Sequence, residues 1–182
     1  CYYLKSGFTH FQRLYPYLCE SGNENRNINY TSYPSEIISQ QLYLGSWYHA
    51  QSIELLRHLG ITHIVNMSGT PGKYENNPIQ YLNASSTIRD TKDTQLRPFI
   101  DDAAHFIENT IKNKGKIVVH CANGISRSPS CIIFYLMFSQ KLRCKDAFQR
   151  VKENRDCIGP NKTFVTTLCN YEKELFNNID ND

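Results

Sequence analysis

Hydrophobic side chains recur along the chain in two patterns, short continuous runs and longer stripes with helical spacing. The short runs predict strands at residues 33–45 (two strands), 61–67, 79–82 and 117–119. The stripes predict helices at residues 50–60, 96–113, 128–138 and 145–154, and from Asn161 onward. Strands that alternate with helices favour an α/β fold, here a mixed, mostly parallel central sheet flanked by helices.

One stretch, residues 117–130, joins a strand, a polar loop and the start of an apolar helix within fourteen residues. The strand ends at His120, and five residues then separate Cys121 from Arg127. Gly124 can adopt a positive φ, which lets such a loop turn its backbone N–H groups inward as a nest for an anion. Pro129 suits the first turn of the following helix, where its missing N–H is not needed.

The chemistry of this loop points to phosphate. Backbone N–H groups beside a helix N-terminus attract a dianion, and Arg127 can bind two of its oxygens with a planar fork. The same positive field favours a thiolate, so we expect Cys121 to have a depressed pKa and to act as a nucleophile. Ser128 is placed to donate a hydrogen bond to the sulfur, and His120 to brace the backbone and help hold the low pKa. The phosphate-binding backbone is then that of Ala122, Asn123, Gly124, Ile125, Ser126 and Arg127.

A cysteine and an arginine at this spacing also recur by chance, and the alternative is a core cysteine with a helix-capping arginine. The His before Cys121, the Gly in the middle and the Ser after Arg127 favour catalysis. This motif closely resembles the active-site signature of the cysteine-dependent protein tyrosine phosphatases, in their dual-specificity branch. The resemblance covers roughly residues 30–176. It implies a protein tyrosine phosphatase-like fold and hydrolysis of phosphotyrosine, phosphoserine and phosphothreonine through a phosphocysteine.

A phosphocysteine mechanism also needs a carboxylic acid to protonate the leaving oxygen. Asp90 and Asp93 lie in a polar loop between a predicted strand and helix. We prefer Asp90 because it closes a strand-like segment at the carboxyl edge of the sheet, whereas Asp93 fits a cap before the helix. The resemblance agrees, although the Pro and acidic residue that often precede the acid in the family are absent here. Asn161 resembles a family position that steadies the phosphate loop, and its alternative role is N-cap of the last helix.

Composition limits the remaining possibilities. The chain has 182 residues, 40% of them hydrophobic, which suits one domain with an appendage. Its net charge of +3 slightly favours anionic substrates, but no Lys/Arg run indicates nucleic acid. The longest apolar run, residues 131–138, is too short to cross a bilayer. Seven scattered cysteines without a C-x-x-C pair indicate neither a metal nor a cofactor and favour a reducing compartment, cytoplasmic or nuclear.

The predicted organisation has three parts: an extension and linker (1–29), a catalytic domain (30–178) and a tail (179–182). Leu4-Lys-Ser-Gly-Phe8 and Tyr15-Pro-Tyr-Leu-Cys19 resemble the end of the rhodanese-like domain of mitogen-activated protein (MAP) kinase phosphatases, or form an extension packed on the next domain. We therefore expect a phosphoprotein partner, such as a MAP kinase. The alternatives are a catalytically weak phosphate-binding module and a phosphoinositide or RNA phosphatase.

Overall fold

The computed structural model describes residues 33–74, 78–84, 88–91 and 94–177, and all structural statements below concern these residues. The chain divides into two units between Tyr33 and Pro34, and the second unit holds every element described here. The suggested rhodanese-like segment and the predicted tail (179–182) lie outside the described residues. Both stay predictions, as do the proposed domain boundaries.

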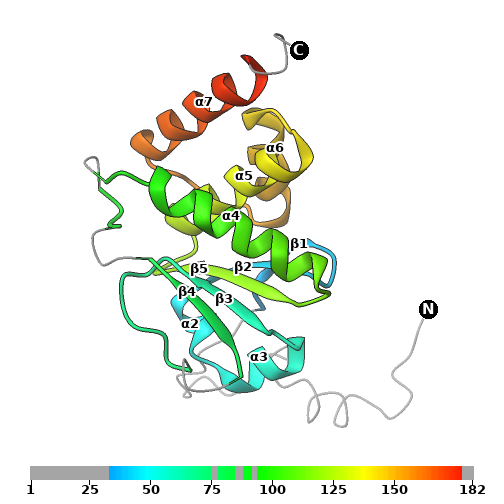
Figure 1. The fold of residues 1–182 in the computed structure, drawn as a ribbon. Coiled ribbons are helices and arrows are strands. Elements are labelled where there is room, and N and C mark those ends of the chain that lie inside the picture. Colours follow the sequence, from blue (N-terminus) through cyan, green and yellow to red (C-terminus); the bar gives the residue numbers. More distant parts are fainter. Residues whose placement is uncertain (1–32, 75–77, 85–87, 92–93, 178–182) are drawn as a thin grey trace, which may run out of the picture. The chain divides into compact units, whose positions relative to one another are not determined.

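A sheet of five strands forms the centre of the second unit, in the order β1-β2-β5-β3-β4 (Figure 1). The strands are β1 (Ser35–Ile38), β2 (Leu42–Ser46), β3 (His63–Asn66), β4 (Gln80–Asn83) and β5 (Ile117–Cys121). Only β1 runs antiparallel to its neighbour, and the other described pairs are parallel. The predicted mixed, mostly parallel sheet is confirmed.

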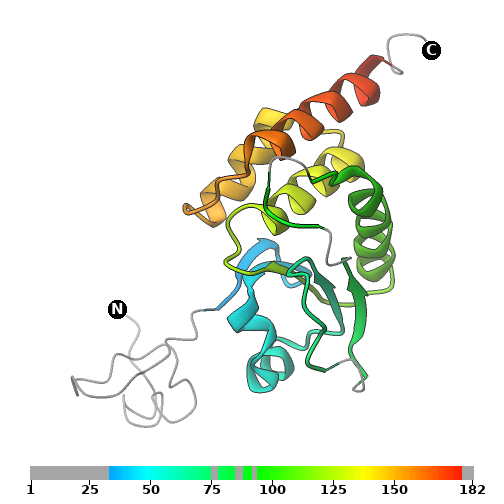
Figure 2. The same ribbon diagram turned by 90° about the vertical axis from the view of Figure 1, so that its left-hand side faces the viewer.

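Helices cover both faces of this sheet, as Figures 1 and 2 show from two sides. The four longest, α4 to α7, lie on one face, and α2 and α3 lie on the other. Their bounds are α2 (Trp47–Ala50), α3 (Ile53–Leu59), α4 (Arg97–Lys112), α5 (Arg127–Gln140), α6 (Cys144–Asn154) and α7 (Lys162–Asn177).

Alternation along β5 divides the core between these two layers. Ile117 and Val119 belong to the larger cluster with α4, α5 and α7, whereas Val118 belongs to the smaller cluster with Leu56 of α3. Successive side chains of a strand point to opposite faces, so a central strand under two helix layers needs an unbroken apolar run. The sequence of β5 meets this need, since all five residues are buried.

The register of the sheet brings the carboxyl ends of three strands together. Cys121 at the end of β5 pairs with Ser46 of β2, and His120 pairs with Asn66 of β3. The loop that follows β5 therefore opens at the edge where parallel α/β sheets bind ligands.

The observed element ends differ from the predicted ones by a few residues. β5 extends to Cys121, α5 begins at Arg127, and the helix predicted from residue 50 begins at Ile53, after the Ser52 cap. It ends at Leu59, and Gly60, with a φ of 70°, is the expected C-cap. The short α2 was not predicted, because four residues are too few to show a helical period.

Candidate active site

Cys121 is buried at the carboxyl end of β5, with its sulfur facing hydrogen-bond donors. The backbone N–H of Gly124 lies 3.3 Å from Sγ, and the Ser128 hydroxyl lies 3.2 Å from it. Burial is the largest effect on the thiol and by itself raises its pKa, but the hydrogen bonds from Ser128 and Gly124 and the charge of Arg127 outweigh it. The net result is a Cys121 pKa below its ordinary value, the expected direction for a nucleophilic thiolate.

The backbone carbonyls of the loop after Cys121 are all bonded to groups outside the loop. Arg155 donates from Nε to the Gly124 oxygen (2.9 Å) and from Nη2 to the Asn123 oxygen (3.2 Å). The Ala122 oxygen accepts from Trp47 N, the Ile125 oxygen from Gly159 N, and the Ser126 oxygen from the hydroxyl and N–H of Ser130. With its carbonyls held on the outside, the loop can present N–H groups on its inner side, as that of Gly124 does to Sγ.

Gly124 is required at its place by both conformation and space. Its φ is 69°, and a Cβ added there would lie 2.7 Å from the backbone oxygen of Gly45 at the end of β2. A larger residue would be unfavourable for two reasons. Residues with a side chain disfavour a positive φ, and the Gly45 oxygen, as a backbone atom, cannot easily move away from an added Cβ. The loop thus packs directly against β2.

Arg127, at the start of α5, is anchored through one terminal nitrogen of its guanidinium. Its Nη1 donates to the carbonyl oxygens of Met67 (2.8 Å), Ser68 (3.0 Å) and Ile88 (3.3 Å). Its Nε is buried and has no hydrogen-bond partner in the described part of the chain. A buried N–H without a partner costs free energy, so this donor suits an anionic oxygen that enters the loop.

His120 lies beside Cys121 as a neutral residue. It is 2% exposed, and burial is the main cause that lowers its pKa to about 4, with smaller contributions from His49 and Arg127. At neutral pH the imidazole is therefore uncharged, and its support for the thiolate cannot come from a positive charge. The contact that remains is between Nδ1 and the backbone oxygen of Cys121, at 3.4 Å.

Asp90 is held at the Ser126 end of the loop, whereas Ala122 lies at the other end. Its Oδ1 accepts hydrogen bonds from the Ser126 hydroxyl and from Asn161 Nδ2, both 2.7 Å long. The backbone N–H of Asn161 in turn donates to Ser126 Oγ at 3.2 Å, which closes a three-residue network. Both carboxylate contacts use Oδ1 and so leave Oδ2 for other partners.

Asn161 makes contacts that fit both roles considered for it. Its Oδ1 accepts from the backbone N–H of Phe164 at 3.0 Å, as an N-cap of α7 does, while its other groups bond Ser126 and Asp90. Asp93, the other candidate acid, lies outside the described residues.

The structure also brings in three residues that the sequence analysis did not single out: Trp47, Arg155 and Gly159. Two of them act through backbone N–H groups, for which side-chain identity gives no signal. Arg155 is one of several basic residues on and after α6, and only its position under the loop distinguishes it.

The chain matches the family described as "Dual specificity phosphatase, catalytic domain" over residues 42–174, which is most of its length. The chain belongs to this family. Among curated relatives, it is 34% identical to a probable rhodanese domain-containing dual specificity protein phosphatase of Dictyostelium discoideum, covering 94% of this chain and 37% of the relative. It is 31% identical to dual specificity protein phosphatase 5 of Homo sapiens, covering 96% of this chain and 51% of the relative.

Solved structures agree with this membership of the dual specificity phosphatases. The crystal structure of human DUSP28 matches with a TM-score of 0.73 and 29% identity, over 79% of this chain and 99% of that one. The match thus covers 99% of the human DUSP28 chain, whereas it covers only about half or less of the two curated relatives.

Two other features are absent from the described part of the chain. None of its helices is long and apolar enough to span a membrane. Its histidines, cysteines and carboxylates form no group of three or more that could hold a metal ion.

Proposed function

We propose that the chain is an active protein phosphatase that hydrolyses phosphotyrosine, phosphoserine and phosphothreonine through a phosphocysteine on Cys121. The observation that carries the proposal is the environment of that sulfur. Cys121 has a lowered pKa and faces a loop whose carbonyls are bonded outward, beside Arg127, whose Nε–H has no partner among the described residues. These groups offer a nucleophile and donors for the phosphoryl oxygens at the same place.

In the first step, the Cys121 thiolate attacks phosphorus, and the bond between phosphorus and the substrate oxygen breaks. The backbone N–H groups of 122–127 and Arg127 bind the phosphoryl oxygens. Asp90 gives its proton to the leaving oxygen, so that serine, threonine or tyrosine departs as a neutral hydroxyl.

In the second step, a water molecule attacks phosphorus and the bond between phosphorus and sulfur breaks. Asp90, now a carboxylate, takes the proton of the water, and inorganic phosphate leaves. The Ser128 hydroxyl, 3.2 Å from Sγ, donates to the departing thiolate. Neither step uses a metal ion or an organic cofactor.

Two observations favour this proposal over the alternatives. A binding module without turnover needs no lowered thiol pKa, whereas Cys121 has one together with Arg127 and Ser128. The loop residues between Cys121 and Arg127 carry no charged side chain, whereas phosphoinositide and RNA phosphatases need to accommodate several phosphates. We further propose a phosphoprotein of a MAP kinase pathway as the substrate, in the cytoplasm or nucleus, on the resemblance of the first twenty residues and the signature motif.

A phosphopeptide panel tests the proposed activity, with Cys121→Ser as the blank. We expect release of phosphate from phosphotyrosine, phosphoserine and phosphothreonine peptides by the native chain and none by the variant.

Asp90→Asn should lower kcat by about 100-fold or more, since general acid catalysis contributes about that much, and should leave KM little changed. If Asp93→Asn lowered kcat by this amount and Asp90→Asn did not, the acid role would pass to Asp93. Turnover retained in Cys121→Ser would refute the mechanism.

A further inference from the structure

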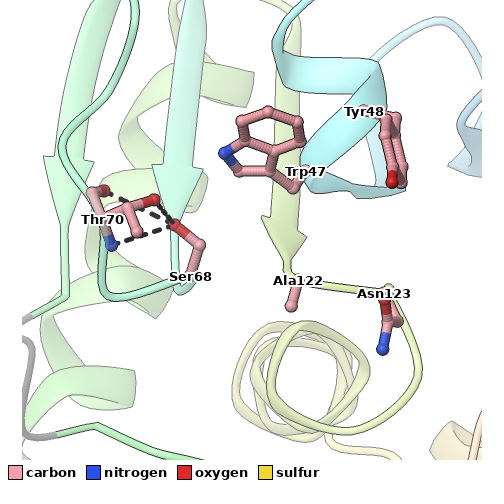
Figure 3. Close-up of a pocket in the computed structure, with 6 residues that line it drawn as sticks. All are labelled: Trp47, Tyr48, Ser68, Thr70, Ala122 and Asn123. Atoms are coloured by element: carbon pink, nitrogen blue, oxygen red, sulfur yellow. Dashed lines mark hydrogen bonds between the residues drawn. The ribbon is translucent and has the colours of Figure 1, made fainter.

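A pocket of about 290 Å³ lies directly beside the proposed phosphate-binding loop (Figure 3). Its walls come from α2, from the segment after β3 and from the start of the loop itself. Figure 3 shows the indole of Trp47 between these walls, with Ser68 and Thr70 on one side and Ala122 and Asn123 below. The lining residues are Trp47, Tyr48, Ser68, Thr70, Ala122 and Asn123.

The pocket suits a neutral, mainly apolar group. None of its six lining residues is charged. Trp47 is 38% and Tyr48 64% exposed, and their rings meet edge to face with centroids 5.4 Å apart. The hydroxyls on the opposite wall, Ser68 and Thr70, are 2.8 Å apart and bond each other, so they do not require a polar partner. Exposed aromatic rings beside satisfied polar groups favour an apolar ligand.

The pocket adjoins the site, and two of its three walls are hydrogen-bonded to the loop or to Arg127. Trp47 N donates to the Ala122 oxygen at 3.0 Å, one residue after Cys121. On the other wall, the Ser68 oxygen accepts from Arg127 Nη1 at 3.0 Å. Asp90 contacts Ser126 at the far end of the same loop, so the pocket and the proposed acid flank the loop at opposite ends.

We infer that this pocket binds an aromatic or large aliphatic side chain next to the phosphorylated residue of a peptide substrate. The inference rests on the proposed function, since that function places the phosphoryl group over the loop. Neighbouring residues in an extended peptide are 3.8 Å apart at Cα, so a side chain close to the phosphorylated residue can reach a pocket that begins at Ala122. The uncharged lining gives no partner to a second phosphate.

Peptide kinetics provide the first test. A phosphotyrosine peptide is prepared with Gly, Asp, Leu or Phe at each of the two positions on either side. We expect kcat/KM to be roughly tenfold higher for Leu or Phe than for Gly at one of these positions, the effect of burying part of an apolar side chain. Trp47→Ala, which removes a wall, and Thr70→Phe, which fills the space, should each bring this ratio close to one.

A matched control removes an exposed apolar side chain outside the pocket. Val165 on α7 is 41% exposed and is absent from the lining, so Val165→Ala should keep the ratio of the native chain. Hydrolysis of p-nitrophenyl phosphate, measured for every variant, shows that the site is folded. Failure of the native chain to hydrolyse it would reject the proposed function, whereas hydrolysis with equal kcat/KM for all peptides would reject only the pocket's role.

Tryptophan fluorescence tests occupancy without turnover, because Trp47 is the single tryptophan of the chain. In Cys121→Ser, the phosphopeptide with Phe at the preferred position should shift the emission, and the Gly peptide should shift it less. An equal shift with phenyl phosphate would mean that the pocket takes the phosphorylated ring itself. An unchanged emission with every peptide would mean that substrate does not reach it. Either result overturns the inference.

Discussion

At the scale of single residues, Cys121 is governed by two opposing effects. Its burial favours the neutral thiol, while hydrogen bonds and the Arg127 charge favour the thiolate and prevail. Of the hydrogen bonds, that from the Ser128 side chain is the strongest contribution. The acidity of Cys121 therefore depends on a hydroxyl as much as on the arginine of the motif.

Ser128→Ala should raise the Cys121 pKa, because it removes a hydrogen bond that favours the thiolate. Activity and alkylation both need the thiolate and therefore increase with pH. In the variant, both increases should occur at a higher pH than in the native chain. The pH dependence of iodoacetamide alkylation measures this shift directly.

Ser139→Ala is the control for this substitution, since Ser139 lies at the other end of α5 and donates to the Tyr135 backbone oxygen. It should leave the alkylation profile in place. An identical profile for Ser128→Ala and the native chain would show that Ser128 does not hold the thiolate.

At the scale of elements, the loop after β5 is shaped from outside by its neighbours. α2 supplies the Trp47 N–H, the segment after α6 supplies Arg155 and Gly159, and α5 supplies Ser130. Arg155 alone binds two successive carbonyls, which makes it a positioning residue for the proposed reaction.

Arg155→Met should lower kcat/KM for p-nitrophenyl phosphate by about tenfold to a hundredfold, because small displacements of phosphate-binding groups weaken the transition state. Binding of inorganic phosphate, a product, should weaken together with activity. Calorimetric titration with inorganic phosphate measures this binding apart from turnover. It compares the Cys121→Ser variant with the double variant that also carries Arg155→Met.

Arg150→Met provides a matched control on α6, because Arg150 bonds the surface side chain of Gln140 and not the loop. It should change neither kcat/KM nor phosphate binding. Equal behaviour of the two variants would show that the loop keeps its form without Arg155.

At the scale of the whole molecule, the central sheet buries a titratable group. His120 lies in β5 under both helix layers, 2% exposed, with its pKa lowered to about 4. In the unfolded chain an imidazole has a pKa of about 6.5. Between these values the unfolded state binds more protons, so the free energy of unfolding falls as pH is lowered from 6.5 towards 4.

Between pH 6.5 and 4, protonation linked to His120 should lower the free energy of unfolding by roughly 3 kcal/mol. This is a large part of the stability of an ordinary domain. Urea unfolding at pH 7, 5.5 and 4.5 measures it, and His120→Gln should flatten the dependence whatever its stability at pH 7. A slope for His120→Gln equal to that of the native chain would contradict the assignment.

The sequence by itself determined the local features of this protein. Periodicity predicted the strands and the five longer helices, since each pattern reports which side of a single element is buried. The motif at 121–127 was equally visible, because the residues that surround the sulfur follow one another along the chain. The short α2 was not predicted, because its four residues are too few to show the helical period of hydrophobic residues.

Only the tertiary structure decided which distant residues meet at the loop, although the sequence had already pointed to Asp90 and Asn161. Arg155 lies 31 positions from Gly124, and Asp90 lies 36 positions from Ser126 and 71 from Asn161. Their meeting depends on the order of strands and the packing of helices, which the period of a single element does not specify. The pocket at Trp47 has the same origin, since its walls follow three different strands and meet only because the sheet aligns their carboxyl ends.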